Sequence, residues 1–348
     1  MIAIKILGSL IVLIATYLIV IIMFPILRVK RQPMPQITSK YSTPPCRRNV
    51  TFEVNGLALS GWLYIPEETT VKVPCILLNT GFCGTKDMII EQYALRFVEA
   101  GFAAFSFDYR HFGESDGEPR QLYSVRKQIE DARGAIVHLR SLKEIDPDKI
   151  VVWGTSAGGN YGIALAAEDH RIAGVIGQCS SLDHRVDGKH VLKQVGIAWM
   201  LKLLIHAQRD KGRSRFGLSP HMLPAIGVPG TTAILNVPGA YEGYARLVKS
   251  SKLFRNEIVA RTIVEPHGPN IIEAAKRVTC PMVFFQCEND QIVAPNSHVK
   301  IAEVTGNLGI FHTLPIDHFE IYEGEWFDKV VRMQVDFISK VTDKRPAA

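Results

Sequence analysis

The sequence lacks the short motifs that usually bind metals and nucleotides. It has no glycine-rich phosphate-binding loop, no HExxH motif and no cluster of histidine, cysteine and aspartate residues, so we predict neither a metal nor a nucleotide cofactor. Zinc-finger spacing, an RNA-binding signature and a long basic stripe are also missing, which argues against a nucleic-acid partner. The six cysteines include no CxxC pair. We expect reduced thiols, several of them buried in strands, rather than a disulfide framework.

The composition is that of a globular protein with an excess of positive charge. Of the 348 residues, 47% are hydrophobic and 21% are charged, which provides enough apolar material for a large core and argues against a disordered chain. The formal net charge is +6. Part of this excess lies beside one long hydrophobic segment, so a membrane surface explains it better than a nucleic acid does.

That hydrophobic segment covers residues 6–27 and is almost wholly apolar. About 20 apolar residues span a bilayer as a helix. A cleaved signal peptide usually has a shorter apolar region and a small-residue cleavage site, whereas Leu27 is followed directly by Arg28. We therefore predict a retained transmembrane anchor over residues 1–27, and a signal peptide or a buried core helix are the alternatives.

The charges that flank this segment indicate its orientation. Lys5 precedes it, and the basic residues that follow it include Arg28, Lys30, Arg31 and Lys40. The positive-inside rule then favours a main domain that faces the cytoplasm. Residues 28–48 contain four prolines, so we expect an extended tether there. The main domain is predicted to occupy residues 49–348.

Strands and helices alternate along most of this domain. Asn55-Gly56 joins two β-rich runs, residues 49–54 and 57–65, and this dipeptide is typical of a tight hairpin. Further strands are predicted at residues 75–79, 102–107, 149–153, 172–179, 282–286 and 311–314, and helices at residues 88–100, 125–142, 157–167 and 326–341. The pattern predicts an α/β fold with a mostly parallel eight-stranded sheet and helices on both faces.

The alternation fails over residues 183–275. An insertion of this length between sheet elements is usually a lid over an active site. We therefore predict a helical lid or cap here, and a packing module without a gating role is the alternative.

A serine nucleophile is indicated by the sequence Gly154-Thr155-Ser156-Ala157-Gly158. This motif follows a predicted strand and opens a predicted helix, which is the context of a nucleophile elbow. A serine in so tight a turn takes a strained backbone conformation, and the two glycines remove side chains that would clash with it. The N-terminus of the following helix also favours negative charge at Ser156.

The same five-residue pattern occurs at residues 113–117, around Ser115, but without that context. No strand directly precedes it, and Glu118-Pro119 follow it in place of a helix. Carboxylates flank Ser115 on both sides and would oppose the negative charge of an alkoxide or an oxyanion. We interpret this second motif as a turn.

His318 is the best candidate for the general base among 11 histidines. It lies just after the last predicted strand, near the edge of a parallel sheet where catalytic groups gather. The order nucleophile, acid, histidine along the chain also fits this architecture. His111 and His170 are less well placed, and a surface-loop histidine is the alternative interpretation of His318.

The acid that orients the histidine should follow an earlier strand, and Asp290 does so. It would hold the imidazole in one tautomer and stabilise the imidazolium. The alternatives are Glu288 on the same loop, Asp183 after the preceding strand, and Asp317 beside the histidine. Asp317 is too close in sequence to face the imidazole comfortably.

An oxyanion hole requires two backbone N–H groups. One should come from Ala157, the residue after the nucleophile. The other should come from the loop Thr80-Gly81-Phe82-Cys83-Gly84, where nearby glycines let the backbone approach the substrate, and we favour Phe82. An ordinary glycine turn is the alternative for this loop.

Three stretches carry a resemblance to known proteins: GFCGTKD at residues 81–87, DYRHFGESDG at residues 108–117 and VWGTSAGG at residues 152–159. With them the chain resembles α/β-hydrolases of the dienelactone hydrolase, acetylxylan esterase and X-Pro dipeptidyl peptidase type, near the fungal polyketide transferase-like hydrolases. The resemblance covers residues 49–181 and 280–338 well, and the middle of the chain poorly.

The resemblance implies a triad of Ser156, Asp290 and His318, with oxyanion donors at Phe82 and Ala157. The chain departs from the family pattern at two positions. It has Thr80 where the family usually has a histidine, and Cys287 where the family usually has a glycine.

Together these features predict a membrane-anchored serine hydrolase. We expect cleavage of a carboxylic ester or thioester through an acyl-enzyme intermediate. The predicted anchor and lid suggest a lipophilic acyl compound as the small-molecule substrate. Acyl transfer with the same triad, peptide cleavage, and a non-catalytic binding protein on the same scaffold are the alternatives.

Overall fold

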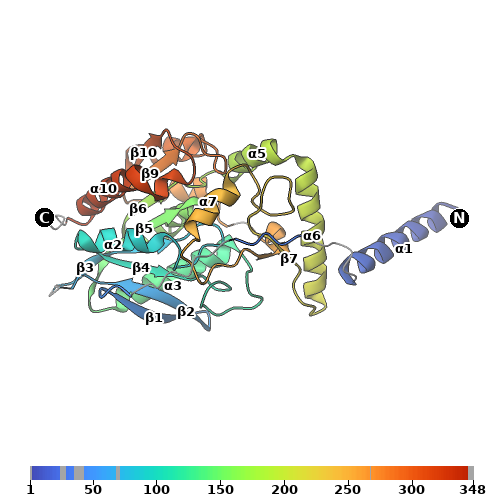
Figure 1. Ribbon diagram of the computed structural model, residues 1–348, viewed down its shortest axis with the longest axis horizontal. Coiled ribbons are helices and arrows are strands. Elements are labelled where there is room, and N and C mark those ends of the chain that lie inside the picture. Colours follow the sequence, from blue (N-terminus) through green and yellow to red (C-terminus); the bar gives the residue numbers. More distant parts are fainter. Residues whose placement is uncertain (1, 24–28, 35–42, 68–70, 267, 344–348) are drawn as a thin grey trace.

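A twisted sheet forms the centre of the computed structural model, which describes residues 2–23, 29–34, 43–67, 71–266 and 268–343 (Figure 1). Across the described residues this sheet has eight strands in the order β1-β2-β4-β3-β5-β6-β9-β10. Their bounds, in that order, are Arg47–Val54, Leu57–Tyr64, Ala103–Phe107, Val73–Asn79, Ile145–Thr155, Ile172–Gln178, Met282–Cys287 and Gly309–Leu314.

Within this sheet, β2 runs in the direction opposite to the strands on either side of it. It pairs antiparallel with β1 and with β4, whereas every pair from β4 through β10 is parallel. Asn55-Gly56 joins β1 to β2 as the hairpin turn that the sequence predicts, and both residues have positive φ. The prediction of a mostly parallel eight-stranded sheet is therefore confirmed.

Helices cover both faces of the sheet. One face packs against α2 (Ile90–Glu99) and α10 (Gly324–Val341), and the other lies against α3 (Val125–Ser141), α4 (Tyr161–Ala166), α8 (Ile271–Ala275) and α9 (Val299–Thr305). The central strand β3 is buried along its whole length. Its apolar sequence follows from this, because a parallel strand between two helical layers has no solvent-facing side.

The helix predicted at residues 157–167 is divided in the structure. A 3₁₀ turn covers Ser156–Asn160, and the α-helix begins only at Tyr161. Gly158-Gly159 lie in this turn, and glycine is a poor α-helix former. A Cβ on Gly159 would lie 2.1 Å from the Ser180 hydroxyl oxygen, so the tight packing of the turn requires a glycine there.

Residues between β6 and β9 form a long insertion, and its first part, from α5 through α7, lies above the carboxyl ends of the strands. It contains α5 (His184–Val195), α6 (Ile197–Arg215), β7 (Met222–Leu223), α7 (Ala240–Leu247), β8 (Ile258–Val259) and α8. Asp183 caps α5 by accepting the N–H groups of Arg185 and Val186. Gly196, with φ of +80°, lets the chain turn from α5 into α6. We call the region from α5 through α7 the cap.

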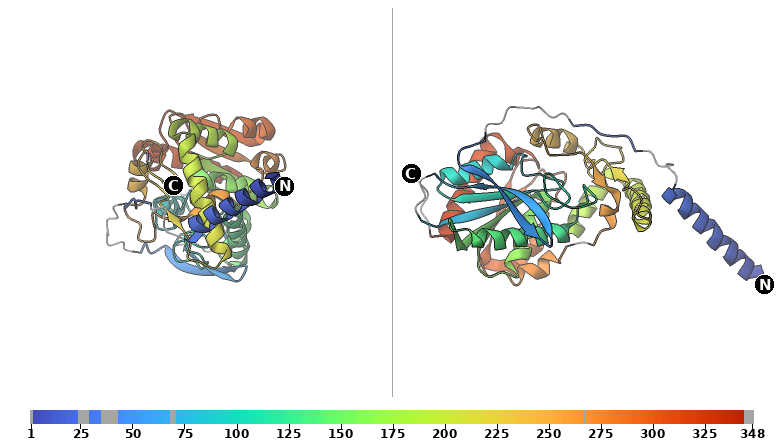
Figure 2. Two further views of the ribbon diagram at one scale, coloured as in Figure 1. Left: turned by 90° about the vertical axis from the view of Figure 1, so that its right-hand side faces the viewer. Right: turned by 90° about the horizontal axis from the view of Figure 1, so that it is seen from below.

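The N-terminal helix α1 (Ile2–Met23) projects from the cap side of the molecule, and α10 lies at the far side (Figures 1 and 2). An 18-residue window from Lys5 to Ile22 has a mean hydropathy of 2.5, enough to cross a membrane by length and composition. Most of the predicted tether lies outside the described residues. Its described part, residues 29–34, contacts the cap through a hydrogen bond from the Tyr241 hydroxyl to the Pro33 carbonyl. Asn256, in the segment after the cap, donates a hydrogen bond of 2.6 Å to the Gln32 carbonyl.

Candidate active site

Ser156 lies in the sharp turn between β5 and the 3₁₀ helix. Its φ is +53°, a left-handed value that is costly for a serine. Neighbouring glycines make the turn possible. A Cβ on Gly154 would lie 2.2 Å from the Gly158 carbonyl oxygen, and one on Gly158 would lie 2.3 Å from the Thr80 carbonyl oxygen. The strained turn lifts the Ser156 hydroxyl above the carboxyl ends of the strands.

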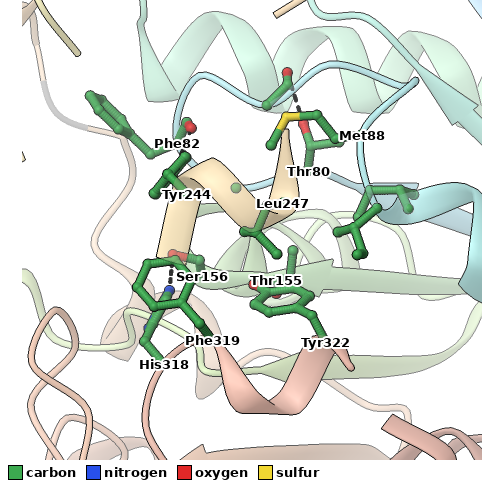
Figure 3. Close-up of a pocket in the computed structure, with 14 residues that line it drawn as sticks. Thr80, Phe82, Met88, Thr155, Ser156, Tyr244, Leu247, His318, Phe319 and Tyr322 are labelled. Carbon is green, nitrogen blue, oxygen red and sulfur yellow. Dashed lines mark hydrogen bonds between the residues drawn. The ribbon is translucent and has the colours of Figure 1, made fainter. Parts of the chain in front are cut away.

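Ser156, His318 and Asp290 form a hydrogen-bonded chain. The Nε2 atom of His318 is 3.1 Å from the Ser156 hydroxyl oxygen (Figure 3). Its Nδ1 atom is 2.6 Å from Oδ2 of Asp290. All three residues are buried. The sequence placed them 162 and 28 residues apart, and the fold brings them together at one edge of the sheet.

Backbone groups hold the Asp290 carboxylate in place. Its Oδ1 atom accepts the N–H groups of Ile292 at 2.7 Å and Val293 at 2.8 Å. Burial alone would lower the pKa of His318, but the adjacent Asp290 carboxylate outweighs it and raises that pKa well above its ordinary value of 6.5. The carboxylate therefore stabilises the imidazolium form of His318.

The alternative acids have other partners or face solvent. Asp183 forms an ion pair of 2.9 Å with Lys300, and Oδ1 of Asp317 accepts the N–H groups of Phe319 and Glu320. Glu288 is exposed. Asp290 is the candidate acid that contacts His318.

The other histidines and the second serine motif also lie elsewhere. Ser115 donates a 2.5 Å hydrogen bond to the Asp108 carbonyl and accepts the N–H group of Ser60, so it stabilises a turn. His170 lies beside Thr279. Burial, the largest effect, and the nearby Lys127 lower the pKa of His111 to about 4. None of these residues contacts the Ser156–His318 pair.

The loop after β3 passes directly over Ser156. A Cβ on Gly81 would lie 3.1 Å from the Ser156 Cβ atom. Phe82 and Ala157 both line the same cleft as Ser156. The hydroxyl of Thr80, one of the two departures from the expected family pattern, donates to the Gly84 carbonyl at 3.2 Å and so closes the loop internally.

Tyr244 of the cap also contacts this loop, and sequence analysis did not identify it as a site residue. Its hydroxyl donates a 3.0 Å hydrogen bond to the Phe82 carbonyl. The two residues are 162 positions apart, and no local pattern marks such a contact. Cys287, the other departure from the family pattern, is buried at the end of β9.

Two cavities meet at Ser156. A small one of about 30 Å³ lies beside His318 and Tyr322 (Figure 3). A larger cleft of about 700 Å³ extends beneath the cap and is lined mainly by apolar side chains, among them Leu192, Trp199, Met200 and Ile234. Only the larger cleft has the size of a typical ligand site. Among the residues that the structure describes, no group of three His, Cys, Asp or Glu side chains is placed to hold a metal ion.

A further buried acid, Asp187 of α5, connects the cap to the loop that carries Asp290. Its carboxylate accepts hydrogen bonds from the Ser181 hydroxyl at 2.6 Å, the Ala294 N–H at 3.0 Å and the Ser297 hydroxyl at 3.1 Å. Burial raises the pKa of Asp187 to about 6. The sequence singled out neither Asp187 nor its partners.

Comparisons with known proteins agree with this architecture. A family model described as serine aminopeptidase, S33, matches residues 73–311. The chain is 38% identical to a quorum-quenching protein, AidA, from Acinetobacter baumannii (strain MDR-ZJ06), over 86% of this chain and 97% of that protein. It is 33% identical to the polyketide transferase ATR5 from Stachybotrys chlorohalonatus (strain IBT 40285), over 85% of this chain and 97% of that protein.

Solved structures show the same fold. The α/β-hydrolase GrgF from Penicillium sp. sh18 superposes with a TM-score of 0.71 at 24% identity, over 85% of this chain and 99% of that chain. The expected resemblance to α/β-hydrolases and to polyketide transferase-like proteins is thus confirmed. The chain belongs to the serine aminopeptidase S33 family of α/β-hydrolases, and it is an enzyme of the hydrolase type.

Proposed function

We propose that the protein is a membrane-anchored serine hydrolase that cleaves carboxylic esters or thioesters of lipophilic acyl groups. One observation carries the proposal: the hydrogen-bonded chain from Asp290 through His318 to Ser156 opens into a large apolar cleft. A nucleophile, a base and an orienting acid in this order are the groups that acyl-enzyme chemistry requires.

The proposed reaction begins when the Ser156 oxygen attacks the substrate carbonyl while Nε2 of His318 takes the hydroxyl proton. The N–H groups of Phe82 and Ala157 stabilise the resulting oxyanion. His318 then gives its proton to the departing alcohol or thiol, which leaves an acyl-Ser156 ester. Water, activated by His318, attacks this ester and releases the carboxylic acid.

The two cavities support a lipophilic acyl group. The small cavity beside His318, at about 30 Å³, has room for only about two or three water molecules, so we place the acyl chain in the larger cleft. Apolar side chains of α5 and α6, including Leu192 and Met200, line that cleft. A chain of several methylene groups would bury apolar surface there, worth roughly 0.8 kcal/mol for each methylene.

The proposed anchor is α1, with the main domain on the cytoplasmic side. Its window from Lys5 to Ile22 is long and apolar enough to span a bilayer, and the basic residues that follow it support this orientation. We further propose that the cap acts as a lid over the cleft, since it supplies much of the cleft's lining.

Labelling with a fluorophosphonate probe tests the nucleophile. We expect the intact chain to be labelled and the Ser156→Ala variant to be unlabelled. Ser115→Ala changes the same sequence pattern at a site without a base, so it should keep its labelling as long as its thermal unfolding remains cooperative. Equal labelling of Ser156→Ala and the intact chain would remove Ser156 from the mechanism.

A series of p-nitrophenyl esters of increasing chain length then tests the substrate class. We expect kcat/KM to rise with chain length until the cleft is filled. Turnover of short, water-soluble esters alone would contradict the lipophilic substrate.

Acyl transfer is the second candidate function, because a relative is named a polyketide transferase. Product analysis with added alcohols or amines distinguishes transfer from hydrolysis, and a panel of peptide amides would detect a peptidase.

A further inference from the structure

Helix α6 of the cap carries a row of exposed apolar side chains. Ile197, Leu201 and Ile205 are 63%, 52% and 41% exposed. They are spaced four residues apart, so they lie on one face of the helix. A continuous apolar row on a surface otherwise exposed to water is typical of a face that contacts a partner or a membrane.

The exposed charge on α6 is positive. Lys202, Lys211 and Arg215 are exposed. Asp210, the single acidic residue in the sequence of α6, is fully buried and forms an ion pair of 3.0 Å with Arg261. Basic side chains beside an apolar row are the pattern of a helix that lies on an anionic lipid surface.

The end of α1 is attached to the same helix. Arg213 donates a 3.1 Å hydrogen bond to the Ile22 carbonyl, and Arg209 donates another to the Ile21 carbonyl. Carbonyls in the last turn of a helix have no partner within it, and cations are favourable at that end. In Figure 1, α6 stands crosswise to α1, as a helix on a membrane surface would stand to one that spans the membrane.

A cleft of about 650 Å³ lies in the angle between the two helices. Tyr17 and Leu18 of α1 line one side, and Leu201 and Ile205 of α6 line the other. Two of the three residues of the exposed row therefore face the candidate membrane span. The row is continuous with the surface that the anchor would present to lipid.

The opposite side of α6 faces the active site. Trp199 and Met200 line the cleft that contains Ser156, and the Trp199 indole donates a 2.9 Å hydrogen bond to the Ala233 carbonyl. A single helix thus separates the apolar row from the substrate cleft.

We propose that α6 lies in the headgroup region of the bilayer that α1 spans, with Ile197, Leu201 and Ile205 inserted among the lipids. Lys202, Lys211 and Arg215 contact anionic headgroups. This arrangement rests on the proposed anchor, and for the role of the cleft it rests on the proposed function. It places the substrate cleft one helix away from the bilayer, so that a lipophilic acyl substrate reaches Ser156 from the membrane alongside α6.

A fluorescent probe at position 201 of the full chain tests this arrangement. The environment-sensitive probe NBD is attached to Leu201→Cys in a Cys46→Ala background, because Cys46 is partly exposed and the other five native thiols are buried. The chain is reconstituted into vesicles of equal parts phosphatidylcholine and phosphatidylglycerol. We expect the emission to lie at shorter wavelength than that of a free NBD–cysteine adduct in buffer. We also expect lipids that carry a nitroxide near the headgroup to quench most of the intensity.

Two matched positions complete the test. Val137 is 66% exposed and lies on α3, a helix that covers the sheet and is not part of the cap, so NBD on Val137→Cys should be insensitive to the nitroxide lipids. Leu13, in α1, is 68% exposed, and NBD on Leu13→Cys should be quenched by a nitroxide near the bilayer centre. All three measurements are repeated in Ser156→Ala, where we expect the same results because no turnover is needed.

Each outcome decides the proposal. If position 201 behaves as position 137 does while position 13 is quenched, α1 spans the membrane but α6 does not touch it, and the proposal is overturned. If position 13 is not quenched either, the anchor and the proposal fail together. Because the probe reports lipid contact alone, neither result depends on whether the chain hydrolyses esters.

Discussion

The carboxylate of Asp290 and the imidazole of His318 lie 2.6 Å apart, and both side chains are buried. The other oxygen of the carboxylate accepts two backbone N–H groups from the residues that follow it. Held at both oxygens, the carboxylate keeps Nδ1 of His318 protonated and so leaves Nε2 to accept the proton of Ser156. The proposed mechanism therefore requires the negative charge of the Asp290 side chain, and a neutral side chain of the same size and shape would not replace it.

Asp290→Asn should lower kcat by on the order of 10⁴, because an amide can fill the site but favours the wrong imidazole tautomer. Steady-state hydrolysis of a p-nitrophenyl ester measures the loss. Glu288→Gln is the matched control, since this carboxylate is exposed on the same loop and its removal should change kcat little. A fall of less than tenfold for Asp290→Asn would mean that another group orients His318.

The pH dependence of kcat/KM should show an acid limb above pH 6.5. His318 has to be neutral to accept a proton, and Asp290 raises its pKa well above 6.5. Activity should therefore increase as the pH rises through the folded-state pKa. The raised pKa also means that His318 stabilises the fold below pH 6.5 and that this contribution is lost as the pH rises through the folded-state value. An acid limb at or below pH 6.5 would contradict the assignment.

Asp187→Asn should make the free energy of unfolding less dependent on pH. Burial raises the pKa of Asp187 from 3.8 to about 6, so the folded protein favours its protonated form. The protonated carboxyl of Asp187 therefore contributes to the free energy of unfolding below pH 3.8. This contribution, about 3 kcal/mol, is lost as the pH rises through about 6. Asparagine stays neutral and can keep hydrogen bonds to the two serine hydroxyls.

Urea unfolding at several pH values between 4 and 7 measures this difference between Asp187→Asn and the intact chain. Asp336→Asn replaces an exposed acid on α10 and should leave the intact chain's pH profile unchanged. Parallel profiles for Asp187→Asn and the intact chain would show that Asp187 does not titrate in this range.

Local sequence patterns predicted the elements whose signal is contained in a few neighbouring residues. Asn55-Gly56 marked the hairpin, and Gly154 and Gly158 marked the turn at Ser156, because in each case the backbone conformation itself requires those residue types. The position of His318 could be predicted from chain order and from its place after the last strand. The catalytic roles of these residues remain predictions.

Contacts between distant parts of the chain could not be predicted in this way. Tyr244 reaches the Phe82 carbonyl from the cap, and Asp187 binds Ser297 across 110 residues. Tyrosine and aspartate occur throughout the sequence, and only the packing of the cap on the sheet selects these two. The 3₁₀ turn at Ser156–Asn160 was not predicted either. Gly159 packs closely against Ser180 in a neighbouring loop, and a local pattern does not reveal such a contact.

Lys86 was part of a sequence stretch that resembled the family, and the structure gives it a physical role. Its side chain is fully buried, and Nζ lies 2.5 Å from Asp108 Oδ2 and 2.7 Å from Glu114 Oε2. The N–H group of Lys86 also donates to Asp108 Oδ1 at 2.8 Å. Burial raises the pKa of Asp108, and Lys86 opposes that rise by stabilising the carboxylate.

Lys86→Met should lower the free energy of unfolding by about 3–5 kcal/mol, because methionine fills much of the same volume but leaves the Asp108 carboxylate buried without its cation. Denaturant unfolding at neutral pH measures the loss. Arg171→Met is the matched control: it removes an ion pair of 2.7 Å with Asp148 in which both side chains are more than half exposed, so its cost should be about 0–1 kcal/mol. Equal losses of unfolding free energy for the two variants would mean that burial does not set the strength of the Lys86 ion pair.

Because Lys86 follows the loop over Ser156, we also expect Lys86→Met to reduce fluorophosphonate labelling at denaturant concentrations that leave Arg171→Met folded.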